Sequence, residues 1–397
     1  MFSIEVVALY VSRHPELTPG YSEHHSDPFE SPYGFEASGS WNWRSALDTF
    51  GPALLRERIK VAVEAPLTGS QANNGQDIWR GTRLAAEQIN LAGGVDGKLI
   101  QLLAADDQAN PALALPVAKR AAARGAVAVV GPYNSGVGVL NLPLYEKLRV
   151  VPLHLTSSNE TDGEGVTIQP KNNQISPPEV SYIESFQPSR VAMLGDPSDY
   201  TTGMADRNQQ SLEADGVEVL RFEVREGLSD YSDVVSQALA TQPDVVYVST
   251  YYPEGASIAK DLEALQTGLP VLFGLANVDA AFVEQAGLAA SQIGAFCGVP
   301  DPSQLPTATD YVEDYITRYS EQPGVWGTFG YDSLKLWAQD VDRFKTVAYG
   351  PVLQALRETR DYLGQTGTIS IDPITGNRLE LPIYILDVND EGVFVIE

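Results

Sequence analysis

Small hydrogen-bonding side chains gather at two places in this sequence of 397 residues, each after an apolar run typical of a buried strand. The first is Gly-Pro-Tyr-Asn-Ser-Gly at 131–136, and the second is Thr-Ser-Ser at 156–158. In an open parallel sheet, ligands bind beyond the carboxyl ends of the strands, where helix N-termini present free backbone N–H groups. Hydroxyl and N–H donors there suit a carboxylate or another small polar head group. Neither segment contains a group typical of a catalyst, so the pattern predicts binding.

The common signatures of enzymes are not found in this sequence. Tyr133 stands where the first glycine of a G-x-S-x-G nucleophile motif around Ser135 would be. Lys98 lacks the following Ser or Thr that a phosphate-binding loop requires. The chain has 4 His and 1 Cys, and we interpret His154 as a structural histidine and Cys297 as a buried thiol. We therefore expect a protein that is not an enzyme, with no catalytic residue, no metal and no cofactor.

The excess of acidic residues limits the kinds of molecule that the protein is expected to bind. The chain has 26 Lys and Arg against 52 Asp and Glu, which gives a formal net charge of −26. Nucleic acids and anionic membranes require a basic surface, so neither is expected as a partner. We interpret the acidity as a solubilising surface, with a high-salt habitat as the alternative. The first residues have no basic region and no small-residue cleavage site, so no signal peptide is visible.

The polar segments lie within two series of alternating strands and helices. Such alternation predicts parallel sheets covered by helices on both faces, an α/β fold with two doubly wound lobes. The strands are expected at 59–63, 99–104, 126–130 and 150–155 in the first series, and at 190–194, 217–224, 245–249, 271–273 and 293–297 in the second. Residues 1–58 show neither the helical nor the strand period of apolar residues and are expected to form a loosely ordered N-terminal extension.

From residue 59 to the end, the chain resembles a known family, the type I periplasmic solute-binding proteins of branched-chain amino acid (Leu/Ile/Val-binding) ABC transporters. Several short motifs occur in the order and spacing of that family. They are Ile-Lys-Val-Ala-Val at 59–63, Pro-Leu-Thr-Gly at 66–69, Ala-Gly-Gly-Val-Asp-Gly-Lys at 92–98, Asp-Asp-Gln at 106–108, the segment 131–136, Pro-Leu-Tyr at 143–145 and Tyr-Tyr-Pro-Glu at 251–254.

The resemblance implies a division of the chain into two lobes with the ligand in the cleft between them. Ligand contacts to both lobes favour the closed form, so closure is a population shift about a hinge. Lobe 1 is expected to comprise 59–170 plus 300–364, and lobe 2 to comprise 171–299 plus 365–397. The connecting strands are expected near 169–174, 296–301 and 362–368.

The resemblance also implies which side chains contact the ligand. The positions that hold its carboxylate and ammonium fall on Ser135, Thr156 and Ser158. Tyr200 and Tyr251 match cleft tyrosines of the second lobe. Tyr133 and Trp326 fall where the family lines the side-chain pocket. Turn capping remains the alternative role for the hydroxyl residues, and core packing remains the alternative for the aromatic residues.

The sequence departs from the family at two positions near the expected site. The acidic residue that receives the ligand's ammonium is replaced by Ala276, with Asn277 or Asp279 as possible substitutes. Asn74 replaces a cleft aromatic residue. Burying an ammonium without a carboxylate partner costs several kcal/mol. The ligand is therefore expected to be an amide, a carboxylate without an ammonium group, or a differently anchored amino acid.

Together these features predict a solute-binding protein that captures a small amino acid or a related carboxylate or amide. It would deliver this ligand to the permease of an ABC importer, in the periplasm or another extracytoplasmic space. The alternative is a ligand-sensing domain of a receptor, or a cytosolic regulator with the same fold.

Overall fold

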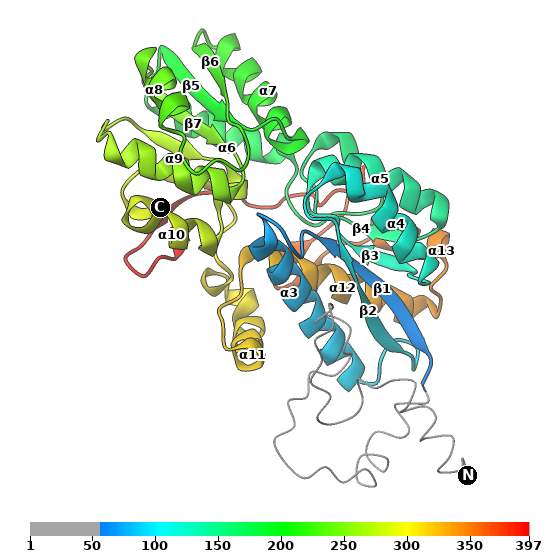
Figure 1. Ribbon diagram of the computed structural model, residues 1–397. Helices are drawn as coiled ribbons and strands as arrows, with labels where there is room; N and C mark the ends of the chain where they lie inside the picture. The colour runs from blue at the N-terminus through cyan, green and yellow to red at the C-terminus, as the bar shows by residue number, and fades with distance from the viewer. Residues whose placement is uncertain (1–55, 397) are drawn as a thin grey trace, which may run out of the picture.

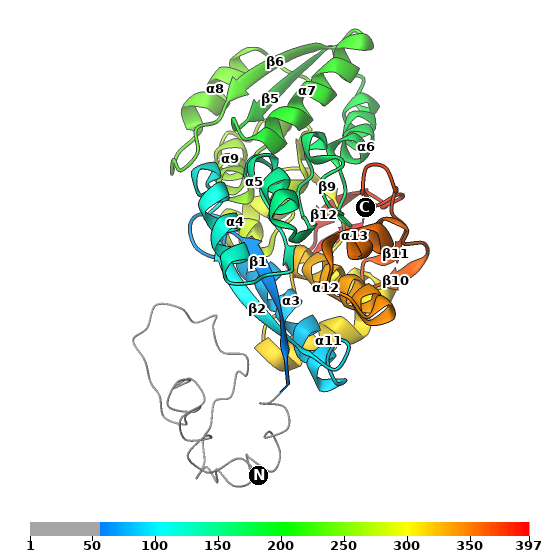
Figure 2. The same cartoon turned by 90° about the vertical axis from the view of Figure 1, so that its right-hand side faces the viewer.

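The computed structural model describes residues 56–396, so nearly all of the expected N-terminal extension lies outside the described residues. The described chain forms two α/β lobes joined by several connecting segments (Figure 1). Each lobe has its own mostly parallel sheet with helices packed against it (Figure 2). The predicted fold class is therefore confirmed. Among residues 56–396, no helix combines the length and the apolar character needed to cross a membrane.

Lobe 1 is built on a four-stranded parallel sheet with the strand order β2-β1-β3-β4. Its first elements are β1 (Arg58–Ala65), α3 (Ala72–Leu91), β2 (Leu99–Asp106), η2 (Pro111–Leu113), α4 (Ala114–Ala123), β3 (Ala128–Val130), α5 (Ser135–Leu148), β4 (Val151–Leu153) and η3 (Asn159–Thr161). Strands β1 and β3 carry several β-branched residues, and Val61, Val63 and Val130 are fully buried. This pattern is typical of a parallel sheet covered on both faces.

Lobe 2 is built on a seven-stranded sheet with the order β13-β12-β9-β8-β7-β5-β6. Its first elements are α6 (Asn172–Ser185), β5 (Arg190–Gly195), α7 (Asp199–Ala214), β6 (Glu218–Glu223), α8 (Ser232–Ala240), β7 (Val245–Ser249), α9 (Tyr252–Ala264), β8 (Val271–Phe273), η4 (Leu275–Asn277), α10 (Ala280–Ala286), η5 (Gly287–Ser291) and β9 (Ala295–Gly298). The strands from β6 to β9 are parallel, as the alternating sequence pattern predicts.

The chain then returns to lobe 1 and finally adds two strands to lobe 2. The returning elements are η6 (Pro302–Gln304), η7 (Pro306–Ala308), α11 (Thr309–Tyr319), α12 (Val325–Phe344), α13 (Tyr349–Arg357), β10 (Tyr362–Gly364) and β11 (Gly367–Ile369), followed by β12 (Tyr384–Val388) and β13 (Phe394–Ile396). Strand β12 pairs antiparallel with β9 and with β13, which lies at the edge of the lobe 2 sheet.

The third connection differs from the one expected at 362–368. These residues form the antiparallel β10–β11 hairpin, in which Gly364 pairs with Gly367. Gly367 has a φ of 91°, a conformation that glycine adopts without strain and that a tight turn requires. The chain reaches the lobe 2 sheet only at Tyr384. Of the segments expected at 169–174 and 296–301, residues 172–174 belong to α6 and residues 296–298 belong to β9. Only 169–171 and 299–301 lie outside the helices and strands.

Helices α3 and α12 pack closely in lobe 1 and set the position of the cleft. A Cβ atom added to Gly81 would lie 1.9 Å from the carbonyl oxygen of Gly327, so only glycine allows this approach. The buried Asp77 of α3 accepts hydrogen bonds from the backbone N–H groups of Gly324 (3.0 Å) and Gly327 (2.6 Å) at the start of α12. A carboxylate at a helix N-terminus is stabilised by the helix dipole.

Candidate functional site

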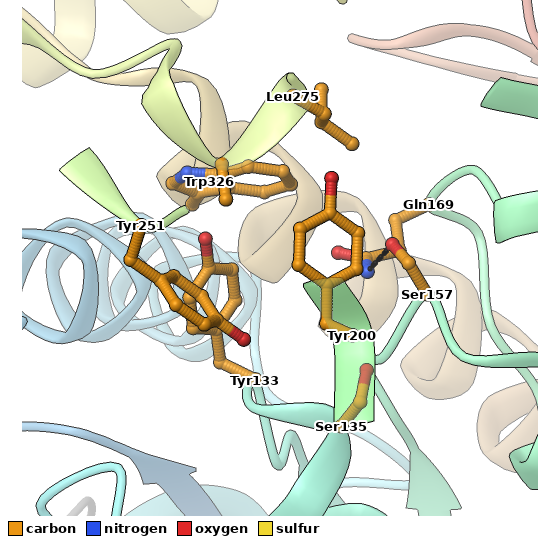
Figure 3. A pocket seen from close by; sticks show the side chains of 9 residues that line it. Tyr133, Ser135, Ser157, Gln169, Tyr200, Tyr251, Leu275 and Trp326 are labelled. Carbon is orange, nitrogen blue, oxygen red and sulfur yellow. Dashed lines mark hydrogen bonds between the residues drawn. The ribbon is translucent and has the colours of Figure 1, made fainter. Parts of the chain in front are cut away.

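The candidate site is a small cavity between the lobes, which we call the cleft cavity (Figure 3). Its volume, taken as the space open to the centre of a water-sized sphere, is about 10 Å³. This is enough for about one water molecule. A larger guest therefore requires the lobes to separate or the side chains to move. The lining residues are Tyr133, Ser135, Ser157, Gln169, Tyr200, Tyr251, Leu275, Ala276 and Trp326.

Ser135 is held at the start of helix α5 in lobe 1. The preceding Asn134 is extended, with φ −77° and ψ 130°, and the helix begins at Ser135 itself. The backbone N–H of Ser158 donates to the Ser135 hydroxyl oxygen at 3.2 Å, which leaves the hydroxyl proton free to donate. The first N–H groups of a helix have no partner within it and carry a partial positive charge, so this end of α5 favours an anionic or carbonyl oxygen.

Ser157 and Gln169 form a second polar group on the lobe 1 side. The Gln169 side-chain amide donates to the Ser157 hydroxyl oxygen at 2.8 Å, and this hydroxyl donates to the carbonyl of Pro170 at 2.8 Å (Figure 3). These bonds link the loop after β4 to the first connection between the lobes. The Oε1 atom of Gln169 is buried without a hydrogen-bond partner, so the group has a free, uncharged acceptor.

Aromatic side chains from both lobes meet across the cleft cavity. Tyr133 of lobe 1 contacts Trp326 with ring centroids 5.1 Å apart and Tyr251 of lobe 2 at 6.3 Å. Tyr251 in turn lies 5.8 Å from Tyr200. Such edge-on and tilted pairs are favourable contacts beyond the area that they bury. The aromatic cluster therefore helps to hold the lobes together.

The tyrosines act as neutral hydrogen-bonding groups. Burial raises the pKa of Tyr133, Tyr200 and Tyr251 above the usual value for a phenol. The hydroxyl of Tyr200 and the indole nitrogen Nε1 of Trp326 are buried without a hydrogen-bond partner. An indole N–H is a donor only, so it requires an acceptor.

The nearby carboxylates accept hydrogen bonds from protein donors, although Glu179 Oε1 is buried without a partner. Glu179 of α6 is fully buried, and its Oε2 accepts from Tyr247 Oη (2.7 Å) and Asn208 Nδ2 (2.6 Å). Burial raises the pKa of Glu179 to about 7. Asp196 accepts from Thr201 Oγ1 at 2.8 Å. Neither acid is among the residues that line the cleft cavity.

Five of the side chains expected from the sequence line the cleft cavity. They are Tyr133, Ser135, Tyr200, Tyr251 and Trp326. Their contact with a ligand stays a prediction, but the structure brings them together from separate elements of both lobes. Ala276 also lines the cavity, at the place expected for an acidic residue.

Three other expected residues have different surroundings and are not among the lining residues. The Thr156 hydroxyl pairs with His154 Nδ1 (2.8 Å) and with Thr161 Oγ1 (2.7 Å). The Ser158 hydroxyl accepts from the N–H of Glu160 at 3.2 Å, and so caps a short 3-10 helix. Asn277 Nδ2 donates to the carbonyl of Thr250 at 2.9 Å.

Sequence reasoning missed Ser157, Gln169 and Leu275 as lining residues. Ser157 could have been found from the alternation of side chains along an extended segment. His154 and Thr156 share one side and bond to each other, so Ser157 between Thr156 and Ser158 points to the other side. Gln169 and Leu275 have no comparable signal in the sequence.

The fold and the cleft are those of a hinged solute-binding protein. The family model described as "Periplasmic binding protein" matches residues 58–392, so the chain belongs to this family. The family and its curated relatives are solute-binding proteins and not enzymes, as the sequence predicts.

Individual relatives support this assignment. "Leu/Ile/Val-binding protein homolog 2" of Brucella abortus is 26% identical over 331 residues, which cover 79% of this chain and 86% of the relative. A leucine-binding protein from Thermotoga maritima has a similar structure, with a TM-score of 0.79, 24% identity and coverage of 85% of this chain and 97% of its own. A branched-chain amino acid transporter substrate-binding protein from Streptococcus pneumoniae, solved with isoleucine, has a TM-score of 0.77 and 23% identity, and covers 86% of this chain and 100% of its own.

Proposed function

We propose that the protein captures a small amino acid or a related carboxylate or amide in the cleft cavity and delivers it unchanged to an ABC importer. The observation that carries this proposal is the position of Ser135. Its hydroxyl lies at the N-terminus of α5, faces the cleft cavity, and stands opposite Tyr200 and Tyr251 of the other lobe. Donors of this kind suit the oxygen atoms of a small polar head group.

The lining favours binding by closure of the lobes. The aliphatic hydroxyl and amide groups come from lobe 1, whereas Tyr200 and Tyr251 come from lobe 2. Once the side chains have moved to admit a guest, the guest contacts both walls only when the lobes are close together. A ligand shifts a conformational equilibrium by as much as its affinities for the two forms differ. A closed, loaded form is what a membrane permease would recognise, and this proposal places the protein outside the cytoplasm.

The first test is to identify the compound that the protein binds. Mass spectrometry of the material released when the purified protein is denatured should show a small polar solute, and calorimetry should show that it binds again. The Ser135→Ala and Tyr251→Ala variants should each weaken this binding by about 1–3 kcal/mol, because a buried hydrogen bond is lost. The exposed Ser291 offers a control, since Ser291→Ala should leave the affinity unchanged. Unchanged affinity in both cleft variants would remove the site assignment.

A further inference from the structure

One acidic side chain does bridge the cleft, and protein groups occupy both of its oxygen atoms. Asp279, which precedes α10 in lobe 2, accepts at Oδ1 from Asn73 Nδ2 (2.8 Å) and from the N–H of Ala281 (2.7 Å). Its Oδ2 accepts from Asn74 Nδ2 at 2.7 Å. Both asparagines belong to α3 of lobe 1. We call this contact the Asn–Asp latch.

The latch is shielded from solvent, which strengthens it. Asn74 is fully buried, and Asp279 is 9% exposed. A hydrogen bond to a charged acceptor is stronger than a neutral one, and water competes less for it when it is buried. A further bond between the lobes runs beside it, from the hydroxyl of Tyr252 to the carbonyl of Ser70 at 2.9 Å. The protein thus supplies its own polar contacts for closure.

The latch also occupies a carboxylate that could have met a cationic ligand. Both oxygens of Asp279 already accept from N–H groups, so the acid has little to gain from an added ammonium group. None of the residues that line the cleft cavity is charged. Moving an ammonium into such a site without a charged partner costs several kcal/mol.

The groups that do face the cavity suit oxygen atoms. The Ser135 hydroxyl, the unpartnered Tyr200 hydroxyl and the N-terminus of α5 can all donate, and Tyr200 is 5% exposed. The unpartnered acceptor among the lining side chains is the neutral Oε1 of Gln169. A carboxylate is therefore well matched by the cavity, whereas an ammonium is matched by neutral groups alone.

We propose that the cleft selects small carboxylates that carry no ammonium group, and that the Asn–Asp latch closes the lobes in place of a bond between an acid and a ligand ammonium. This inference rests on the proposed function, because it names the chemical class of the ligand. It assigns Asn73, Asn74 and Asp279 to closure and not to ligand contact.

The direct test compares matched pairs of compounds that differ in the amino group. Calorimetry at neutral pH would use leucine with isocaproate, valine with isovalerate, alanine with propionate, and phenylalanine with hydrocinnamate. In the pair that binds best, the carboxylate without an amino group should bind about tenfold or more tightly than the matching amino acid. Tighter binding of the amino acid would overturn the inference and leave the proposed function standing. If no compound binds and no solute is released from the purified protein, the proposed function fails, and the inference fails with it.

A variant designed to bind amino acids more tightly tests whether the cleft lacks a negative charge. Ala276→Glu places a carboxylate among the lining residues, so it should move the preference toward the amino acid of the pair by about tenfold or more. Ala276→Gln is the control of matched size and should produce no such change. Equal effects of the two variants would show that the charge is not what the cleft lacks.

A charge exchange tests the latch. Asn74→Asp opposes Asp279 with a second carboxylate, so it should weaken binding of the acid about tenfold and increase the radius of gyration. The double variant Asn74→Asp with Asp279→Asn places the carboxylate on lobe 1 and the amide on lobe 2, and should recover both values. An unchanged affinity and radius in Asn74→Asp would show that the latch does not stabilise closure.

Discussion

The two walls of the cleft differ in their chemistry. Lobe 1 contributes the aromatic side chains of Tyr133 and Trp326 and, in addition, aliphatic hydroxyl and amide groups that hydrogen bonds hold in place. These polar side chains are Ser135, Ser157 and Gln169. Lobe 2 contributes Tyr200, Tyr251, Leu275 and Ala276, which present aromatic and apolar surface with a few hydroxyl groups. Neither wall carries a charged side chain.

This difference indicates that the two lobes have different roles in binding. The lobe 1 wall provides directional hydrogen bonds, which fix the orientation of a polar head group. The lobe 2 wall provides area that becomes buried when the lobes approach, and burial of aromatic surface is favourable without being directional. The orientation of the head group should therefore depend mainly on lobe 1, whereas Tyr200 and Tyr251 of lobe 2 should act mainly by burying surface on closure. Substitutions on the two walls should separate these roles.

The largest effect is expected from removing the aromatic support of the lobe 1 wall. Trp326 is 2% exposed and packs against Tyr133 and Phe329. Trp326→Ala should lower the free energy of unfolding by about 3–5 kcal/mol, because a large buried side chain is replaced by a cavity. Phe344→Ala on the same helix is the control, since Phe344 is 47% exposed. Similar losses in urea unfolding of both variants would contradict this role for Trp326.

The second largest effect is the pH dependence of stability that comes from the buried carboxyl group of Glu179 in lobe 2. Burial raises the pKa of Glu179 from 4.5 to about 7, so the folded protein binds this proton more tightly than the unfolded chain does. The stabilisation that protonated Glu179 provides should therefore be lost as the pH rises from about 4.5 to 7, which lowers the free energy of unfolding by about 3 kcal/mol. Above pH 7 this contribution should change little. Glu179→Gln should remove this fall, so the variant should exceed the wild type in stability at alkaline pH.

Urea unfolding at acidic and alkaline pH measures this difference. The exposed Glu313 offers a control, because Glu313→Gln should follow the wild type at both values. A Glu179→Gln variant with the pH dependence of the wild type would show that this carboxyl group does not titrate abnormally.

The smallest effect separates two neighbouring hydroxyl residues of lobe 1, of which Ser157 lines the cavity and Thr156 does not. The Thr156 hydroxyl bonds to His154 and Thr161 inside lobe 1, so Thr156→Val should lower the free energy of unfolding by about 1 kcal/mol and leave ligand affinity unchanged. Ser157→Ala should weaken ligand binding, because Ser157 lines the cavity. Calorimetry and urea unfolding of both variants would check this, and weaker binding in Thr156→Val would contradict it.

The sequence was sufficient to predict the fold because its local patterns agree with one another. Buried β-branched strands such as β1 and β7 alternate with helices, and glycine-rich turns separate them. The third connection was harder to predict. The segment 362–368 has strand-like character, but the Gly-Gln-Thr-Gly turn folds it back on itself as a hairpin within lobe 1.

Some of the residues expected at the site do not line the cleft cavity, and the difference has a structural cause. Trp326 lies far from Tyr133 and Ser135 in the sequence, and the resemblance to a family placed them together. In the run Thr-Ser-Ser, adjacent side chains point to opposite sides, and a shift of one residue exchanges the cleft side for the core side. The partnership of Asp279 with Asn73 and Asn74 depends on how the two lobes meet, and no local pattern encodes it.

The central claim is that two hinged lobes close over a small solute and hold it between unlike walls. Small-angle X-ray scattering of the full chain, titrated with the compound released from the purified protein, tests this claim most directly. The radius of gyration should decrease as the compound binds, and Tyr251→Ala should reduce the decrease at equal saturation. A radius of gyration that stays constant while calorimetry records binding would contradict the claim.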